Sequence, residues 1–444
     1  MKKLIQTIKN IFKIEELRKK ILYTLGILLI FRLGCYVVIP GINPDALGNL
    51  AKQTEGGLMS IIDMFSGGAF SNASIFALGV MPYITASIIM QLLGIVFPYF
   101  QKLQKEGESG RKKMNQLTRY LTIGVLLLQV PAYLANLSAR LPDGAFVLTN
   151  AAGAANFWYY ASAAAVLIAG TMFVMWLGEK ITDKGIGNGV SLLIMVGILA
   201  RLPHALVAEI NTRFTESTGG LVMLIVQLVM WYLVFMATIA LVQAVRKIPV
   251  QYTKRIVGNK QYGGVRQYIP LKINAANVMP IIFAQALMMI PMLFGRFEAT
   301  RGLAATFNDV TGFWYNFVFA LLIIAFTYFY TAITVNPNMM ADDLKRNGGF
   351  IPGIKPGKAT VNYIDTVMTR ITLPGSIFLA IVAIMPAFAQ IMGINAQFSF
   401  FFGGTSLLIM VGVILDTLKQ IESYLLLRHY DGLMKTGRIK GRTA

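Results

Sequence analysis

Ten runs of predominantly apolar residues divide this chain of 444 residues, and no other feature limits its possible folds so strongly. The hydrocarbon core of a bilayer is about 30 Å thick, so a helix needs roughly 20 apolar residues to cross it. The runs cover residues 21–39, 73–97, 117–136, 157–177, 187–202, 221–245, 274–294, 313–335, 371–392 and 400–418. Charged residues make up only 14% of the chain, against about 25% in soluble domains. The sequence therefore excludes a set of soluble domains and predicts an all-α, polytopic membrane protein with ten transmembrane helices.

The positive charges indicate the orientation of these helices. Because ten is an even number, both termini are expected on the same side of the membrane. The segments on that side hold 32 Lys and Arg, whereas the alternate segments hold 5. Cytoplasmic loops carry such an excess, so we expect the N-terminal segment 1–20 and the tail 425–444 in the cytoplasm. No small-residue cleavage site follows the first apolar run, which is therefore expected to be a span and not a removed signal peptide.

The predicted cytoplasmic loop 246–273 is strongly basic, with seven Lys and Arg and no Asp or Glu. Two interpretations of this charge remain open. It can hold the loop in the cytoplasm and contact anionic lipids, or it can dock a large anionic partner such as RNA.

Two segments depart from the regular pattern of spans. Residues 60–70 are apolar, but eleven residues of helix at about 1.5 Å each reach only about 16 Å and cannot cross a bilayer. The fifth run, 187–202, is short and begins in the glycine cluster 185–189. A phosphate-binding loop is a weak interpretation of this cluster, since no strand precedes it and no Lys-Ser or Lys-Thr pair follows. A close approach of two helices or a flexible helix start is favoured.

The chain also contains a weak internal repeat. Val80-Met81-Pro82 and Val278-Met279-Pro280 match at an offset of 198, in the second span of each group of five. Groups of five spans must have opposite orientations, so the repeat predicts an inverted pair of halves. We expect the first half at 21–202, an external hinge loop at 203–220 and the second half at 221–424.

Catalytic chemistry is poorly supported. The two histidines, His204 and His429, fall in predicted loop and tail segments, and the one cysteine is Cys35. Among residues at membrane depth, Arg32, Asp63 and Asp416 are ionisable and are therefore candidates for function; for Arg32 a structural partnership is favoured over snorkelling. We expect no enzyme activity, no metal site and no cofactor. A small-solute secondary transporter with inverted repeats is the alternative, although no carboxylate relay lies in mid-membrane.

Six stretches resemble the SecY family, the channel subunits of the Sec protein translocase. They are SIFALGVMPYI (74–84), KEGESGR (105–111), WLGEKIT (176–182), GIGNG (185–189), NGGFIPGIKPG (347–357) and FGGTSLLI (402–409). The resemblance runs in order over about residues 20–434. It implies a protein-conducting channel with two inverted five-helix halves around a central pore.

The resemblance also implies site residues. An apolar pore ring is expected at Val80, Ile84, Val190, Ile194, Ile282 and Ile409. A plug that seals the external side is expected at Ser60, Ile61, Ile62, Asp63, Met64, Phe65, Ser66, Gly67 and Gly68. A lateral gate, where signal sequences and nascent membrane proteins leave for lipid, is expected near Thr85, Ser87, Gln91, Asn188 and Asn277. For any one of these residues, ordinary helix packing or interhelical hydrogen bonding is an alternative.

Finally, the resemblance implies partners and a location. The loops 246–273 and 336–370 are similar to docking sites for the ribosome and the SecA motor ATPase, and we expect contacts at Lys254, Arg255, Lys260 and Lys355. The family usually has arginine at the loop tip where this chain has Lys355, so a bidentate contact there is in doubt. The expected small membrane partners are SecE and SecG, membrane lipids surround the complex, and the expected location is the bacterial cytoplasmic (inner) membrane.

Overall fold

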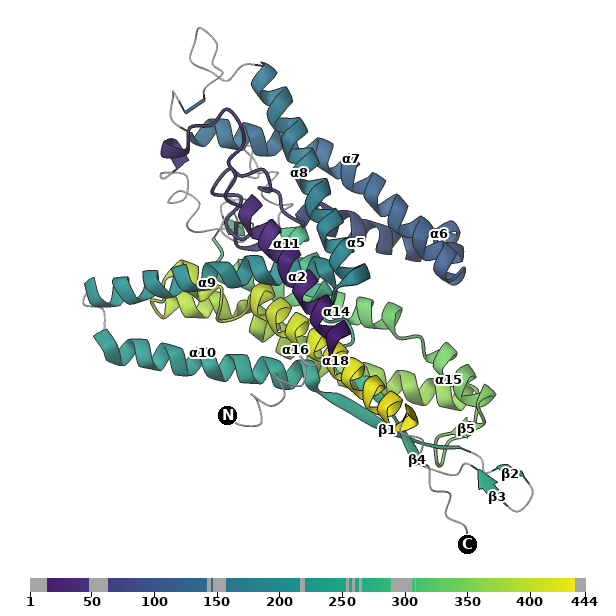
Figure 1. The fold of residues 1–444 in the computed structure, drawn as a ribbon. Helices are drawn as coiled ribbons and strands as arrows, with labels where there is room; N and C mark the ends of the chain where they lie inside the picture. Colours follow the sequence, from purple (N-terminus) through teal and green to yellow (C-terminus); the bar gives the residue numbers. More distant parts are fainter. Residues whose placement is uncertain are drawn as a thin grey trace. The chain divides into compact units, whose positions relative to one another are not determined.

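The protein is mostly helical (Figure 1). The computed structural model describes residues 14–47, 63–141, 145–146, 157–215, 220–252, 255–257, 260–262, 266–288, 306–307 and 309–435. The chain divides into two compact units. Unit 1 comprises residues 1–204 and 413–444, and unit 2 comprises residues 205–412.

Most predicted spans are continuous helices. The helices of unit 1 are α2 (Glu15–Gly34), α5 (Met81–Val96), α6 (Pro98–Lys105), α7 (Glu108–Arg140) and α8 (Phe157–Lys184). Two helices pass from one unit into the other: α9 (Gly189–Thr215) and α18 (Gly404–Lys435). The helices within unit 2 are α10 (Gly220–Gln243), α11 (Met279–Met288), α14 (Phe313–Thr334), α15 (Pro337–Arg346), α16 (Lys358–Ile391) and α17 (Ala396–Ser399).

Seven helices of the described residues are long and apolar enough to cross a membrane, and an eighth counts if the bent pair α5 and α6 is one span. The two helices of that pair meet at 103°. Because α6 begins with Pro98 and carries Gln and Lys, it more closely fits a separate amphipathic helix than the end of a span. The chain is thus a multi-span helical membrane protein, and the count of ten spans stays a prediction.

The prediction of a short fifth span followed by a loop at 203–220 is wrong for residues 203–215, which continue α9. His204, predicted in that loop, is therefore helical. Within this continuation Glu209 and Arg213 form an ion pair of 2.8 Å, with side chains only 2% and 3% exposed. In unit 2 Glu209 also accepts a hydrogen bond of 2.8 Å from the backbone N–H of Asn395. Each of these two buried charges therefore has a partner, which offsets the cost of removing it from water.

The second span was also predicted to begin too early, at residue 73. Residues 66–80 form turns, and α5 begins at Met81 with Pro82 in its first turn, where proline needs no N–H partner. The corresponding helix α11 begins at Met279, again with a proline next, at the same offset of 198. Two residues before each helix the backbone is left-handed, with φ of 54° at Gly79 and 52° at Asn277. This shared geometry supports the internal repeat.

The glycine cluster 185–189 is a helix junction inside unit 1. The backbone N–H of Ile186 donates to Thr24 Oγ1 of α2 (3.1 Å), and that of Gly187 donates to Gln420 Oε1 of α18 (2.8 Å). The N–H of Gly189 donates to Thr182 Oγ1 of α8 (2.9 Å). With these N–H groups occupied, the phosphate-loop interpretation fails and the close approach of helices is confirmed.

We expect Gly189→Ala to destabilise the protein by about 1–3 kcal/mol, because inserting a methyl group into a filled contact forces the backbone apart. A Cβ at Gly189 would lie 1.9 Å from the carbonyl oxygen of Gly178. Gly124→Ala in α7 is the control: no atom lies within 4 Å of its Cβ, and alanine favours a helix over glycine by about 1 kcal/mol. Thermal unfolding in detergent should therefore shift in opposite directions for the two variants. Equal melting temperatures would contradict the close approach.

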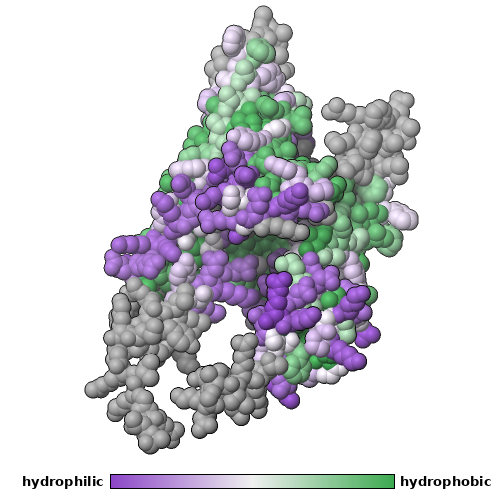
Figure 2. All heavy atoms as spheres, turned by 90° about the vertical axis from the view of Figure 1, so that its right-hand side faces the viewer, coloured by the Kyte–Doolittle hydropathy of each residue, from purple (hydrophilic) through white to green (hydrophobic). Residues whose placement is uncertain are grey.

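Unit 2 carries two small β-sheets that the sequence did not predict. Strand β1 (Val245–Tyr252) pairs with β4 (Arg266–Lys272) and with β5 (Gly349–Phe350), giving the order β4-β1-β5, and β2 (Arg255–Val257) pairs with β3 (Lys260–Tyr262). Both predicted basic loops therefore fold into one element. Apolar side chains bury its inner face against α15 and the start of α16, namely Ile248, Val250, Leu271, Leu344, Ile351, Ile364 and Met368. Figure 2 looks at the molecule from the side where α15 and the strands lie in Figure 1, and hydrophilic residues cover much of that face.

Candidate functional site

The segment 63–80 does not form a helix across the membrane and is held among three helices of unit 1. Each of these helices offers a glycine against it. A Cβ at Gly34 of α2 would lie 2.0 Å from the ring of Phe76, and one at Gly170 of α8 would lie 2.1 Å from the carbonyl oxygen of Ile75. On α9, a Cβ at Gly197 would lie 3.1 Å from the carbonyl oxygen of Phe65. The segment fits closely because these helices present no side chain there.

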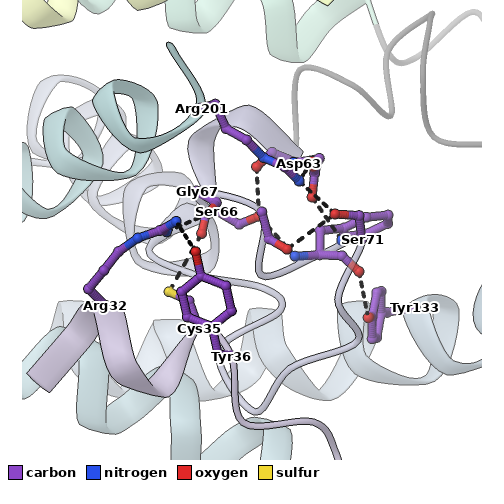
Figure 3. A network of polar contacts seen from close by, with 11 residues as sticks. Arg32, Cys35, Tyr36, Asp63, Ser66, Gly67, Ser71, Tyr133 and Arg201 are labelled. Atoms are coloured by element: carbon purple, nitrogen blue, oxygen red, sulfur yellow. Dashed lines mark hydrogen bonds and ion pairs between the residues drawn. The ribbon is translucent and has the colours of Figure 1, made fainter. Parts of the chain in front are cut away.

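An ion pair fastens the start of this segment to α9 (Figure 3). Asp63 Oδ2 pairs with Arg201 Nη2, and Asp63 Oδ1 accepts a hydrogen bond of 2.8 Å from the N–H of Ser71. The same Arg201 nitrogen donates to Ser71 Oγ at 2.6 Å. Asp63 is 8% exposed and Ser71 3%. The loop between them is thus closed on itself and tied to one guanidinium group.

A second arginine holds the segment from α2. Arg32 Nη1 donates to the carbonyl oxygen of Gly67 at 2.6 Å, and Arg32 Nη2 donates to the hydroxyl of Tyr36 at 3.1 Å. The thiol of Cys35 lies 3.9 Å from the carbonyl oxygen of Ser66, and Tyr133 of α7 donates to that of Phe70 at 3.3 Å. Figure 3 shows the two arginines reaching the segment from separate helices. These contacts agree with a structural partnership for Arg32.

The predicted helix over 60–70 is only partly correct. Ser60, Ile61 and Ile62 lie outside the described residues, and Asp63, Met64 and Phe65 are helical. The helix stops there because Gly67 and Gly68 take φ of 67° and 91°, which lie in the left-handed region. Asp63, Met64, Phe65 and Ser66 are buried.

Sequence reasoning missed Arg201 as a site residue. It lies at the end of the fifth predicted span, 187–202, and an ionisable residue at that depth is itself a signal of function. Asp416, which had been considered, lies exposed on α18.

The predicted ring residues divide between the units. Val80, Ile84, Val190 and Ile194 belong to unit 1, and Ile282 and Ile409 belong to unit 2. Val80 precedes α5, Ile84 lies one turn into it, and Val190 and Ile194 are one turn apart at the start of α9. Val80, Ile194 and Ile409 are buried, and the other three are half-buried. Val190 also packs against Gly178 of α8. Their role as a ring stays a prediction.

The polar residues assigned to the lateral gate make local hydrogen bonds. Thr85 donates to the carbonyl oxygen of Met81 at 3.1 Å, and Gln91 donates to Ser87 Oγ at 3.4 Å within α5. Asn188 precedes α9 and accepts from the N–H of Ser191 at 3.3 Å. Asn277 holds the left-handed position before α11, which asparagine tolerates better than most residues. The contacts given for these residues are local, and their role in a lateral gate stays a prediction.

The described docking residues lie on the two-stranded sheet of β2 and β3 and in the loop before α16. Arg255 and Lys260 occupy β2 and β3, where Arg255 pairs with Tyr262 and Lys260 with Val257, and Lys254 lies outside the described residues. Lys355 is exposed at a turn between Gly353 and Gly357, whose φ angles are 84° and 107°. Its carbonyl oxygen accepts from Thr360 Oγ1 at 3.0 Å, which ties the turn to the start of α16.

The fold and this site define a class: a multi-span helical membrane protein with a non-spanning segment fastened among its helices. The SecY family model matches residues 74–418. The chain is 41% identical to the protein translocase subunit SecY of Chlamydia trachomatis, over 98% of this chain and 99% of the relative. It is 44% identical to that of Halalkalibacterium halodurans, over 97% and 100% of the two chains. The chain belongs to the SecY family.

Solved structures show the same fold. A chain described in "The structure of a protein conducting channel" matches with a TM-score of 0.63 at 17% identity, covering 96% of this chain and 95% of the other. A second, described as having a SecY plug domain that stabilises the closed state, gives 0.61 at 18% identity with the same coverage. The canine Sec61 chain from a ribosome-channel complex gives 0.59 at 16% identity, again covering 96% and 95%.

Proposed function

We propose that this chain is the conduit through which unfolded secretory proteins cross a bacterial cytoplasmic membrane, with both termini in the cytoplasm. Transmembrane segments would leave it sideways into lipid through the lateral gate. Family membership over nearly the full chain supports the transport function. The basic segments on the side of the termini support the orientation.

A closed-channel mechanism is supported chiefly by the segment 63–80, which does not form a spanning helix and packs among α2, α8 and α9. Irregular backbone at membrane depth persists only inside protein or beside a water-filled cavity. Residues 63–71 form one short segment in which Met64, Phe65 and Ala69 are buried, Phe70 packs against Tyr133, and two arginines bind Asp63 and the backbone. Its release would break these contacts without interrupting any of the helices around it. This supports the role of residues 60–70 as a plug. The ring of Val80, Ile84, Val190, Ile194, Ile282 and Ile409 would form the constriction that the plug covers.

The chain would do no chemistry of its own, so the energy for transport comes from a partner. We propose the ribosome and the SecA motor ATPase as cytoplasmic partners, and SecE and SecG as small membrane subunits. The basic sheet element of unit 2 supports cytoplasmic docking, and relatives of the same fold are described in ribosome-bound complexes.

Reconstitution tests the function directly. Proteoliposomes that contain this chain with its co-purified small subunits should import a signal-bearing precursor when motor ATPase and ATP are added, and a precursor without its signal should stay outside. A counterflow assay with candidate solutes tests the alternative of a small-solute transporter. Solute exchange without precursor transport would reject the proposal.

Lys355→Glu should reduce motor-driven transport several-fold while leaving ribosome affinity nearly unchanged, because a single exposed lysine at a loop tip makes a point contact. Lys358→Glu is the matched control, since it makes the same charge change at another exposed residue three positions along. Initial transport rates and ribosome binding are measured for both variants. Equal loss of transport in the two would show a general effect of charge and remove Lys355 from the docking site.

A further inference from the structure

One face of α9 carries two of the six predicted ring residues, Val190 and Ile194. The same face contacts the segment 63–71. Val190, Ile194, Gly197 and Arg201 follow one another at spacings of four, three and four residues, which places them on a single narrow stripe of a helix. Gly197 lies against the backbone of Phe65 and Gly67, and Arg201 binds Asp63 and Ser71. A rigid helix that moves at its ring residues must also move at these contacts.

The two arginines hold the segment in different ways. Arg32 of α2 donates to a neutral carbonyl oxygen, that of Gly67. Arg201 of α9 compensates a buried carboxylate, Asp63. Loss of Arg32 leaves one carbonyl oxygen short of a donor, whereas loss of Arg201 leaves a buried negative charge without its partner, which is the more costly change. Of the two contacts, the one on the α9 side is therefore the more costly to lose.

We propose that Arg201 is a positioning residue that makes release of the plug depend on α9. A polypeptide that presses on Val190 and Ile194 displaces α9, withdraws Gly197 and Arg201 from the segment, and leaves Asp63 uncompensated, so the segment departs. This inference rests on the proposed roles of the ring and the plug. It adds the residue pair and the helix through which the ring acts on the plug.

The first test compares variants of the pair in planar bilayers and in transport of a precursor with a defective signal sequence. Arg201→Gln should raise the frequency of resting openings and the transport of the defective precursor about tenfold, whereas Arg201→Lys, which keeps the charge, should stay close to the parent protein. Adding Asp63→Asn to Arg201→Gln should reverse most of the effect, since no uncompensated charge remains. The control is Arg119→Gln, which breaks the ion pair with Glu179 between α7 and α8, away from the segment.

The second test asks whether α9 connects the ring residues to the segment 63–71. Ile194→Trp should raise the opening frequency in the parent protein and add little in the Arg201→Gln background, because the segment is already released there. Gly67→Ala should raise it without any change of charge, since a Cβ at Gly67 would lie 2.7 Å from Gly197 Cα.

The outcomes separate the inference from the proposed function. If the parent protein transports normal precursor but Arg201→Gln opens no more often than the parent, the positioning role is wrong and the channel function stands. Equal effects of Ile194→Trp in both backgrounds would overturn the connection through α9. If the parent protein does not transport precursor, the proposed function fails first. Thermal unfolding of Arg201→Gln within the range of the Arg119→Gln control excludes general misfolding as the cause.

Discussion

Replacing Ile84, Ile194, Ile282 and Ile409 together by serine is expected to raise the resting ion conductance of the channel about tenfold or more, because an apolar constriction excludes water and a hydroxyl-lined one admits it. Four of the six predicted ring positions then offer hydrogen bonds to water, and a wetted gap conducts ions. The measurement is conductance in planar bilayers with no precursor present.

The control makes the same chemical change on apolar side chains that do not belong to the ring. Leu128 of α7 and Val222 of α10 are 79% and 73% exposed on helices that fit membrane spans. Serine at these two positions should leave the conductance at the level of the parent protein. If the ring variant conducts no more than this control, the six residues are ordinary packing residues and the ring must be sought elsewhere.

Changing Lys254, Arg255 and Lys260 together to glutamate is expected to lower ribosome affinity roughly tenfold or more at low salt. Each basic side chain that contacts an RNA phosphate releases counterions on binding, and this favourable contribution is lost with the contact. For the same reason the slope of log affinity against log salt concentration should become less negative by about two to three. The sheet β4-β1-β5 should be unaffected, because Arg255 and Lys260 lie in β2 and β3 and not in this sheet. Affinity is measured across a salt series.

The matched control changes Lys102, Lys112 and Lys113 to glutamate. These lysines are exposed on α6 and α7 of unit 1 and give the same change of net charge. Membrane orientation, measured by cysteine labelling, should be the same in both variants, because the remaining basic segments are untouched. Equal ribosome affinity of the two variants would leave orientation as the only role of the basic loop.

Some of the fold followed directly from the sequence. The length of each apolar run located most helices to within several residues, because the bilayer sets a requirement on each span separately. The offset of 198 located the starts of α5 and α11 in register, and the glycine cluster predicted a close approach of helices. The segment 60–70 could be located as a run too short to span, but its backbone could not be predicted, since the left-handed conformations of Gly67 and Gly68 are part of a loop that is packed against α9.

Other features depended on residues that are distant in the chain. Asp63 and Arg201 are 138 positions apart, and neither shows its partner in the sequence. Glu209 and Arg213 fall in the stretch predicted as a loop, yet they are buried within α9, where Asn395 and Gly393 lie beside them. The two basic loops became one sheet because Gln251 pairs with Phe350. The sequence by itself determined which parts of the chain are apolar and long enough to cross a membrane, since that requirement depends on local composition. Only the tertiary structure decided where charges can be buried, because that requires a partner whose position the sequence does not contain.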